Sequence, residues 1–272
     1  MKTSVARHLL RLNRNFYNTF AEEFSDSRSA LQPGISEALR QLGSFTSLLD
    51  VGCGDGRVGR AVQESVKRYV GVDFSRNLLN LPVGRPTSQP AHFTFLRADL
   101  ASPHWIKTNE LCLSSEDGRP QRRTSSFILH PSSFDAAVCF SALHHIPGAR
   151  RRLRLLREIR SLLKPRGGCA ISVWQFLHVP RLRRKIVPWA EVGLAPADVD
   201  AGDYLLDWQR GGRGLRYVHH FDETELVSLC ERAGFTVRTV YRSDGHASGR
   251  GNMGLYVILE KKSTGGSVGD RP

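Results

Sequence analysis

The sequence lacks any long apolar run. No stretch of its 272 residues approaches the roughly 18 consecutive apolar side chains that a membrane-spanning helix needs. The N-terminus also lacks the unbroken apolar core and small-residue cleavage site of a secretory signal. We therefore expect a soluble, cytoplasmic protein with no membrane partner. Basic residues precede Glu22, the first acidic residue, as in a mitochondrial transit peptide, but the same stretch fits the first helix of a fold better.

The sequence also lacks closely paired cysteines. Its five cysteines are odd in number and far apart: Cys53, Cys112, Cys139, Cys169 and Cys230. No Cys-x-x-Cys pair is available to hold zinc or to form a redox couple, so we expect a reducing compartment and no bound metal. The adjacent His144 and His145 do not alter this expectation, because neighbouring side chains at a strand end point to opposite faces.

Acidic residues are scarce relative to basic ones. The chain has 39 Lys and Arg against 26 Asp and Glu, which gives a formal charge of +13, and only seven of the basic residues are lysine. Such an excess attracts polyanions and favours RNA, DNA or an anionic membrane over a neutral metabolite as partner. Arginine enrichment also follows from the codon usage of a GC-rich genome, so charge alone leaves both interpretations open.

Short apolar runs alternate with helical patterns along most of the chain. Strands are predicted at 47–51, 69–73, 93–97, 134–140, 169–174, 236–241 and 254–259. Helices are predicted at 4–24, 30–42, 57–68 and 149–163, and from Asp222 to near Gly234. This alternation predicts an α/β fold with a doubly wound, mostly parallel, Rossmann-like sheet of seven strands, which binds its ligand at the carboxyl ends of the strands.

Two segments interrupt the alternation. Residues 101–132 are polar and basic without a usable period, so we expect a flexible surface insertion. Residues 175–220 follow the fifth strand and are rich in aromatic residues and histidine, which suits substrate recognition or equally a lid anchored to the core. The predicted organisation is N-terminal helices at 1–44, a cofactor-binding core at 45–174, a recognition insert at 175–220, the C-terminal part of the sheet at 221–262 and a disordered tail at 263–272.

The most specific local motif is DVGCGDGR at 50–57, which stands at a predicted strand-to-helix turn. Gly52 and Gly54 allow the backbone to approach a ligand closely. Asp73 follows Gly52 by 21 residues, at the end of the next strand, where it can accept hydrogen bonds from both ribose hydroxyls of an adenosine. The motif therefore predicts an adenosine-containing cofactor.

The charges around this turn distinguish between such cofactors. A dinucleotide fingerprint needs glycine at the position of Arg57. Asp50 and Asp55 place carboxylates where they would repel a diphosphate and attract a cation. The predicted cofactor is therefore S-adenosyl-L-methionine, which carries a sulfonium and an ammonium group and no phosphate.

Five motifs in order resemble those of the class I S-adenosylmethionine-dependent methyltransferases. They are DVGCGDGR at 50–57, GVDFS at 71–75, RAD at 97–99, SFDAAVCFSALHHI at 133–146 and LKPRGG at 163–168. The resemblance implies that Asp50 and the turn glycines hold the methionine end of the cofactor and that Asp73 holds the ribose. It also implies that Asp99 binds the adenine amino group, unless it is an ordinary helix cap, and that Phe140 and Ser141 lie beside the methionyl group.

Motifs outside this core are similar to those of the wobble-uridine tRNA methyltransferases, which methylate the carboxylate of 5-carboxymethyluridine in the anticodon. These motifs are FYNTFAEEFSDSR at 16–28, VWQ at 173–175, VPW at 187–189, DYLLDW at 203–208 and RYVHHF at 216–221. The resemblance implies tRNA as a partner. It also makes a small zinc-binding activator subunit, of the kind that eukaryotic relatives use, a second candidate partner.

Methylation of a carboxylate depends mainly on placement, because the acceptor oxygen is already ionised at neutral pH. We expect Arg216 to orient that carboxylate through two hydrogen bonds, with Arg28 as second choice and His219 as a further member of the catalytic group. Side chains expected to stack on the flipped base are Trp174, Trp208, Tyr217 and His219. The basic run expected to contact RNA phosphates, unless it is only a solvated face, is Arg181, Arg183, Arg184 and Lys185.

Two other functions fit the same cofactor motifs. In the first, the chain is a small-molecule O- or N-methyltransferase and its positive charge reflects codon usage. RNA binding that weakens steeply with salt would favour the tRNA enzyme over this alternative. In the second, the chain is a non-catalytic subunit that binds cofactor for an active partner, and methyl transfer by the isolated chain would exclude it.

Overall fold

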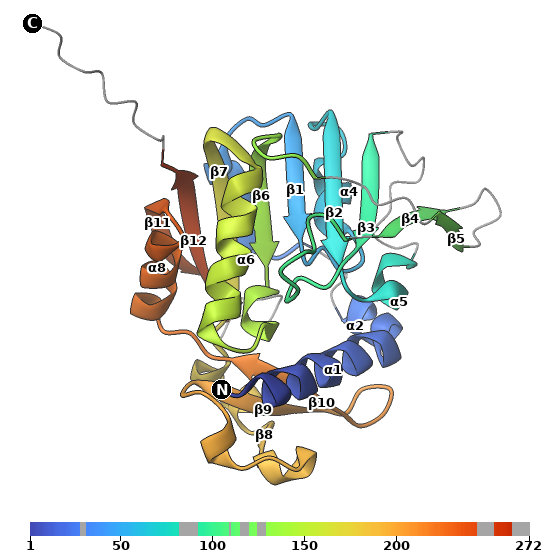
Figure 1. The fold of residues 1–272 in the computed structure, drawn as a ribbon, viewed down its shortest axis with the longest axis vertical. Coiled ribbons are helices and arrows are strands. Elements are labelled where there is room, and N and C mark those ends of the chain that lie inside the picture. Colours follow the sequence, from blue (N-terminus) through green and yellow to red (C-terminus); the bar gives the residue numbers. More distant parts are fainter. Residues whose placement is uncertain are drawn as a thin grey trace, which may run out of the picture.

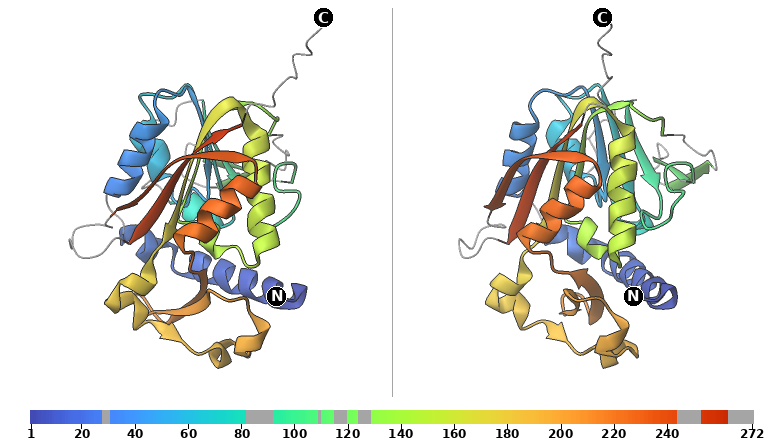
Figure 2. Two further views of the ribbon diagram at one scale, coloured as in Figure 1. Left: turned by 90° about the vertical axis from the view of Figure 1, so that its left-hand side faces the viewer. Right: turned by 60° about the vertical axis from the view of Figure 1, so that its left-hand side comes forward.

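The structure, a computed structural model, describes residues 1–27, 31–81, 92–108, 110–114, 120–123, 129–243 and 253–262. Its centre is one large sheet with helices on both faces (Figures 1 and 2). In spatial order the strands are β11 (Phe235–Ser243), β12 (Gly254–Lys261), β7 (Leu163–Trp174), β6 (Phe134–Phe140), β1 (Ser47–Val51), β2 (Arg68–Asp73), β3 (Phe93–Arg97), β4 (Glu110–Ser114) and β5 (Pro120–Arg123).

The sheet has a parallel centre and antiparallel edges. β3, β2, β1, β6 and β7 pair in parallel, whereas β12 runs antiparallel to β7 and β11 runs antiparallel to β12. These seven strands form the doubly wound, mostly parallel sheet that the sequence predicts, so the predicted fold class is confirmed. Every residue of β1 is buried, as expected for the central strand of a sheet that helices cover on both faces.

Two pairs of helices cover the two faces (Figure 2). α3 (Pro33–Leu42) and α4 (Arg57–Val62) pack on one face, and α6 (Ala149–Leu162) and α8 (Glu223–Arg232) pack on the other. α6 buries side chains at helical spacing: Leu155, Leu156, Ile159 and Leu162. α1 (Thr3–Thr19), α2 (Ala21–Asp26) and α5 (Arg76–Leu79) lie near the carboxyl ends of the central strands (Figure 1). Among the described residues, no helix is both long and apolar enough to span a membrane.

The predicted insert at 175–220 forms a second, smaller sheet. After the short helix α7 (Pro180–Arg183), the strands β8 (Ile186–Val187), β9 (Asp203–Trp208) and β10 (Gly214–His219) pair in antiparallel fashion. Figure 1 shows α1 between this sheet and the carboxyl ends of the central strands. Asn13 of α1 joins the two parts, because its side-chain amide bonds both backbone groups of Tyr217 in β10.

Several local predictions are corrected. The helix expected at 4–24 is two helices, because Phe20 leaves helical geometry with φ −109° and ψ 33°. The helix expected at 57–68 ends at Val62, and the backbone N–H groups of Lys67 and Arg68 bond to the Thr46 carbonyl instead. The predicted tail at 263–272 lies outside the described residues.

The segment at 101–132 also differs from the flexible surface insertion that we predicted. Its described part contains β4 and β5, which extend the sheet beyond β3 as an antiparallel hairpin. Trp105 is fully buried, and its indole nitrogen donates to Glu158 over 2.7 Å. A single buried tryptophan within polar sequence has no periodicity, which is why the pattern did not reveal this anchor.

Candidate active site

A pocket lies at the carboxyl ends of β1, β2 and β6, and residues of α1 and α2 also line it. All eight residues predicted to bind cofactor line this one pocket: Asp50, Gly52, Gly54, Asp55, Asp73, Asp99, Phe140 and Ser141. They come from four separate segments of the chain, which the parallel strands bring to a common edge. Their individual roles stay predictions.

The glycine-rich turn has a backbone that other residues could not adopt without strain. Gly52 has φ 79°, and a Cβ there would lie 2.3 Å from the Ala142 Cβ. Gly54 has φ 57°, and no described atom would lie within 4 Å of its Cβ. The first glycine is therefore needed for close packing, and the second leaves open space beside the backbone where a ligand fits.

Asp73 is held by backbone donors. Its two carboxylate oxygens accept hydrogen bonds from the N–H of Gly54 at 2.9 Å and of Ser75 at 2.8 Å. Burial raises the pKa of Asp73 to about 6, although these backbone donors act in the opposite direction. A carboxylate fixed in this way keeps lone pairs for a ligand's hydroxyl groups.

The two acidic residues of the turn differ in how their charge is compensated. Burial raises the pKa of Asp50 to about 7, although its carboxylate accepts a 2.7 Å hydrogen bond from the Tyr69 hydroxyl. Asp55 is paired with Arg57 through two hydrogen bonds and also accepts one from Ser25 at 2.6 Å. Arg57 already neutralises Asp55, and a pKa of about 7 leaves Asp50 only partly ionised at neutral pH. The expectation that both carboxylates attract the cofactor's positive charge is therefore weaker at both positions and stays a prediction.

Asp99 and Ser141 line the pocket from two different segments of the chain. One oxygen of Asp99 accepts from Arg14 of α1 at 2.9 Å, and the other accepts from the backbone N–H of Ala101 at 3.0 Å. Asp99 thus caps a turn as well as lining the pocket. Ser141 has φ 55°, an uncommon value for a residue with a side chain, and its hydroxyl accepts from the Trp174 indole at 3.1 Å.

Arg216 is the most unusual residue near this pocket. It is only 4% exposed, and its guanidinium lies 5.2 Å, 4.6 Å and 5.3 Å from the ring centroids of Phe16, Trp174 and Trp208. Among the described residues, no group hydrogen-bonds to its Nε or Nη1 atom and no carboxylate forms an ion pair with it. Burial lowers the pKa of Arg216 from its ordinary value, although Tyr17 acts in the opposite direction.

Several contacts hold Arg216 beside the pocket. The backbone of its neighbour Tyr217 donates to Asn13 at 2.7 Å and accepts from the Asn13 amide at 3.0 Å. The pocket residues Tyr17 and His145 are joined by a 2.6 Å hydrogen bond, and Tyr17 also hydrogen-bonds to Arg216. The pocket and the Arg216 side chain therefore share a wall.

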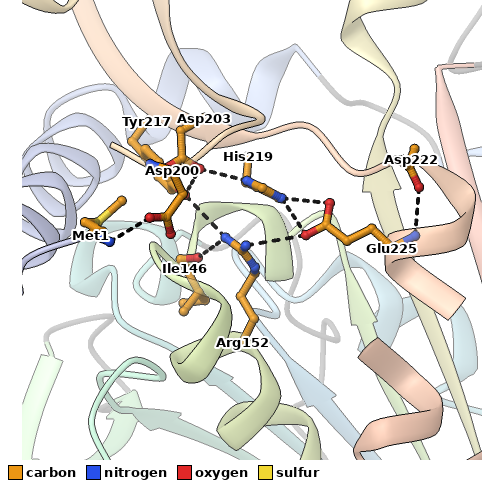
Figure 3. A network of polar contacts seen from close by, with 9 residues as sticks. All are labelled: Met1, Ile146, Arg152, Asp200, Asp203, Tyr217, His219, Asp222 and Glu225. Atoms are coloured by element: carbon orange, nitrogen blue, oxygen red, sulfur yellow. Dashed lines mark hydrogen bonds and ion pairs between the residues drawn. The ribbon is translucent and has the colours of Figure 1, made fainter. Parts of the chain in front are cut away.

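Tyr217 and His219 lie elsewhere, in a buried network that Figure 3 shows. The Tyr217 hydroxyl and His219 Nδ1 both bond the same oxygen of Asp203 at 2.7 Å, and His219 Nε2 lies 2.9 Å from Glu225. Arg152, only 1% exposed, forms an ion pair with Glu225 at 3.6 Å. Stacking on a base requires an accessible ring, so the full burial of Tyr217 and the 2% exposure of His219 contradict that predicted role.

The remaining predicted residues are distributed as follows. Arg181, Arg183 and Arg184 are exposed, and Lys185 is half-buried with its ammonium 5.9 Å from the Trp208 ring centroid. Among the residues that the structure describes, none of these four forms an ion pair with a carboxylate. Trp174 and Trp208 pack on Arg216. Arg28 lies outside the described residues.

The histidine pair is not at a strand end. His144 and His145 belong to a 3-10 helix, Leu143–His145, and their ring centroids are 4.3 Å apart. Over the described part of the chain, no group of three or more His, Cys, Asp or Glu side chains has the geometry of a metal site.

Some residues of this site were missed by the sequence analysis. Asn13, Tyr17 and His145 connect the pocket to Arg216, and Arg14 contacts Asp99. One available signal was that Asn13 falls at helical spacing among the buried Val5, Leu9 and Phe16, because a polar residue on an apolar stripe needs a specific partner. Nothing local in the sequence distinguishes Tyr17 from a core aromatic.

Comparisons with known proteins show the family to which the chain belongs. The model of a family described as "Methyltransferase domain" matches residues 13–240. The mouse protein tRNA (carboxymethyluridine(34)-5-O)-methyltransferase ALKBH8 is 28% identical over 159 residues, which cover 58% of this chain and 19% of that protein.

Solved structures show the same fold. The Burkholderia thailandensis 1,6-didemethyltoxoflavin-N1-methyltransferase, with bound 1,6-didemethyltoxoflavin and S-adenosylhomocysteine, superposes with a TM-score of 0.60 at 19% identity, covering 96% of this chain and 90% of that one. A putative methyltransferase from Haloferax volcanii, in complex with the Trm112 methyltransferase activator, gives a TM-score of 0.58 at 14% identity, covering 93% and 99%.

Proposed function

Because the chain belongs to the methyltransferase-domain family that its residues 13–240 match, we propose that it transfers a methyl group from S-adenosylmethionine to the carboxylate of a modified wobble uridine in tRNA. The matched mouse protein bears the name of a methyltransferase for carboxymethyluridine at position 34 of tRNA, which supports this substrate. The chain spans about a fifth of the length of that relative, so the substrate is argued below from this chain's own residues.

The observation that carries the proposal is the buried, incompletely partnered guanidinium of Arg216. Placing a cation in a low-dielectric site is costly unless an anion or hydrogen-bond acceptors compensate it. Among described residues, two of its nitrogen atoms, Nε and Nη1, have no acceptor. An arginine presents its N–H groups in a planar fork that matches the two oxygens of a carboxylate. The acceptor substrate would supply the missing anion.

The reaction itself asks little of the protein. The carboxylate oxygen attacks the methyl carbon of the sulfonium in line, so a C–O bond forms as the C–S bond breaks and the electron pair stays on sulfur. The carboxylate loses its negative charge as the transition state forms. A strong ion pair to the carboxylate would therefore stabilise the ground state more than the transition state and slow the reaction. Arg216 contributes by orientation, and the aromatic rings around it exclude water.

The charge of the chain supports an RNA partner. The net charge is +13, and Arg181, Arg183 and Arg184 are exposed on the insert that also supplies Trp208 and Arg216. In this proposal they contact tRNA phosphates, and the half-buried Trp174 contacts the base, whereas the buried Trp208 packs on the Arg216 guanidinium. A cytoplasmic location follows from such a substrate. An activator subunit of the Trm112 kind is a further candidate partner, because the Haloferax volcanii neighbour is found with one.

The test compares two tRNAs that differ only in charge at the acceptor group. One carries 5-carboxymethyluridine at the wobble position, and the other carries the neutral, nearly isosteric 5-carbamoylmethyluridine. We expect nucleoside mass spectrometry to show a methyl ester on the first and no product on the second. Methylation of the amide-bearing tRNA at a ring nitrogen, or of neither tRNA while a small molecule is methylated, would contradict the proposal. The assay is run with and without an activator subunit.

A further inference from the structure

A buried hydrogen-bond chain connects the cofactor pocket to Arg216. The Tyr17 hydroxyl lies 2.6 Å from His145 Nε2, and His145 Nδ1 lies 3.0 Å from the carbonyl oxygen of Tyr217. Tyr17 also hydrogen-bonds to the Arg216 guanidinium. Tyr17 and His145 line the pocket and are only 5% and 7% exposed. The hydrogen-bond chain therefore runs from the pocket wall to the buried guanidinium of Arg216.

The groups at the ends of this hydrogen-bond chain determine which member of each pair donates and which accepts. A backbone carbonyl only accepts, so Nδ1 of His145 must carry a hydrogen and donate to Tyr217. A second positive charge on the imidazole is disfavoured, because the ring is buried and shares the Trp174 ring with the Arg216 cation. Neutral His145 then has Nε2 as an acceptor, and the Tyr17 hydroxyl donates to it.

This direction has a consequence for Arg216. The Tyr17 oxygen has given its own hydrogen to His145, so it is left with lone pairs and accepts from the guanidinium. Tyr17 therefore takes up part of the donor capacity of Arg216, whereas Nε and Nη1 keep no described acceptor. The rings of Phe16, Trp174 and Trp208 limit the rotation of the guanidinium around this contact.

We propose that Tyr17 and His145 are a positioning pair that fixes the orientation of the Arg216 guanidinium and thereby directs its Nε and Nη1 hydrogens to the acceptor carboxylate. This inference rests on the proposed function, since it takes a carboxylate as the second partner of Arg216. The pair moves no proton in the reaction. If the acceptor were a hydroxyl or an amine, the same two residues would instead have to remove a proton from it. The hydrogen bonds between Tyr17 and His145 would then point in the opposite direction.

The first test removes one oxygen. Tyr17→Phe keeps the ring that packs on Phe16, Phe24 and His145 and deletes only the hydroxyl. At saturating cofactor we expect the single-turnover rate on carboxymethyluridine-containing tRNA to fall about tenfold, as for a small misplacement of a reacting group. The matched control is Tyr241→Phe, which deletes a hydroxyl that donates to the Gly34 carbonyl at 2.8 Å, outside the site. This control keeps the wild-type rate.

A double variant separates positioning from general packing. If Tyr17 acts only through Arg216, the double variant Arg216→Lys with Tyr17→Phe should transfer the methyl group only slightly more slowly than Arg216→Lys alone. Both changes then remove the same contribution to the rate. The rate of wild-type protein should also stay flat from about pH 6.5 to 8.5, since no acceptor proton is removed. Two results would overturn the positioning role in favour of general-base catalysis. One is that the rate losses of the two single variants add up in the double variant. The other is a wild-type rate that falls at low pH and a His145→Gln rate that does not.

The second test does not depend on activity. Nitrogen-15 NMR of the protein bound to S-adenosylhomocysteine distinguishes the tautomers of His145, and we expect the neutral form with hydrogen on Nδ1. Hydrogen on Nε2, or on both nitrogens, would overturn the inferred direction. The NMR experiment can find hydrogen on Nδ1 while the wild-type protein leaves the carboxylate unmethylated. In that case the proposed function and the positioning role of the pair both fail, but the inferred direction of the hydrogen bonds stands.

Discussion

The two halves of the site compensate charge in opposite ways. On the cofactor side, the acidic residues already have protein donors: Asp73 accepts from two backbone N–H groups, and Asp55 is paired with Arg57. On the proposed acceptor side, Arg216 is equally buried but has two nitrogen atoms without a described partner. The acidic residues of one half therefore have protein donors before a ligand binds, whereas in the proposed function the guanidinium of the other half receives its anion from the acceptor.

This difference fits the charges of the two proposed substrates. S-adenosylmethionine brings positive charge to a wall of carboxylates, and the acceptor brings negative charge to an isolated guanidinium. Tyr17 and His145 line the pocket, and Tyr17 hydrogen-bonds to Arg216, so the two residues lie on the wall between the halves. The two halves should therefore fail separately: changes on one side affect cofactor binding, and changes on the other affect transfer.

The largest effect is expected at Arg216. Arg216→Met keeps most of the side-chain volume and removes the charge. The activity kcat/KM on the carboxylate tRNA should fall about a thousandfold, because two charge-assisted hydrogen bonds of about 1.5–3 kcal/mol each are lost. Cofactor affinity, measured by calorimetry, should not change. The melting temperature should stay level or rise, since replacing an unpaired buried charge by an apolar group removes a desolvation penalty. A matching loss of cofactor affinity would show that the two halves are one site.

The complementary change is Asp73→Ala. The affinity for S-adenosylmethionine should fall by about 1.5–3 kcal/mol, roughly tenfold to a hundredfold, because charge-assisted hydrogen bonds to the ribose hydroxyls are lost. NAD should not bind the wild-type protein, since the acidic turn offers no place for a diphosphate. The rate at saturating cofactor should change far less than the affinity. Calorimetry that shows tight NAD binding, or unaltered cofactor affinity in the variant, would remove the basis for the cofactor half.

The same comparison explains how far the sequence could predict this site. All the residues predicted to bind the cofactor belong to short motifs at strand ends, and strand order places strand ends together. The acceptor half is assembled from single residues of α1, the 3-10 helix at 143–145, β7, β9 and β10. No local pattern connects such distant positions, so Arg216 was predicted only through resemblance, and Tyr17 and His145 were not predicted.

The fold was predictable for a similar reason. Six of the seven predicted strands of the central sheet coincide with observed strands to within two residues at each end, because buried strands show their apolar runs directly. The predicted strand at 169–174 begins earlier, at Leu163, which pairs with Phe134 of β6. Lys164-Pro165-Arg166 resembles a turn in the sequence and falls in the irregularity between that pair and the Ala136–Gly168 pair. Tyr217 and His219 were misplaced because an aromatic, histidine-rich strand has the composition of a binding surface, whereas here it supplies the buried network with Asp203.

A smaller effect is expected from the basic run of the insert. Replacing Arg181, Arg183, Arg184 and Lys185 by alanine should lower tRNA affinity and reduce the salt dependence by roughly 0.7–0.9 log units per lost phosphate contact. Cofactor affinity should not change. A matched control replaces the arginines that pair with glutamate elsewhere, namely Arg40, Arg166, Arg238 and Arg242. Filter binding at several salt concentrations separates the two variants; equal salt slopes would mean that only net charge matters.

The smallest effect concerns the network that joins the insert to the core. Burial alone would lower the pKa of His219, but its hydrogen bonds to Asp203 and Glu225 outweigh burial and raise it above the ordinary value. The folded protein therefore binds this proton more tightly than the unfolded chain. The stabilisation is fully present below about pH 6.5, the pKa of an unfolded histidine, and is lost as the pH rises through the folded value.

Urea unfolding between about pH 6 and 9 should therefore show wild-type stability decreasing, with at most about 1.4 kcal/mol per pH unit coming from this one proton. His219→Gln should flatten that part of the slope, whereas His104→Gln, at an exposed position, should leave it unchanged. Glu225→Gln removes the negative charge of one of the two acceptors and so lowers the folded pKa of His219, so the loss of stability should be smaller and complete at lower pH. A wild-type slope that His219→Gln does not alter would mean that the imidazole stays neutral and that Arg152 alone balances the carboxylates.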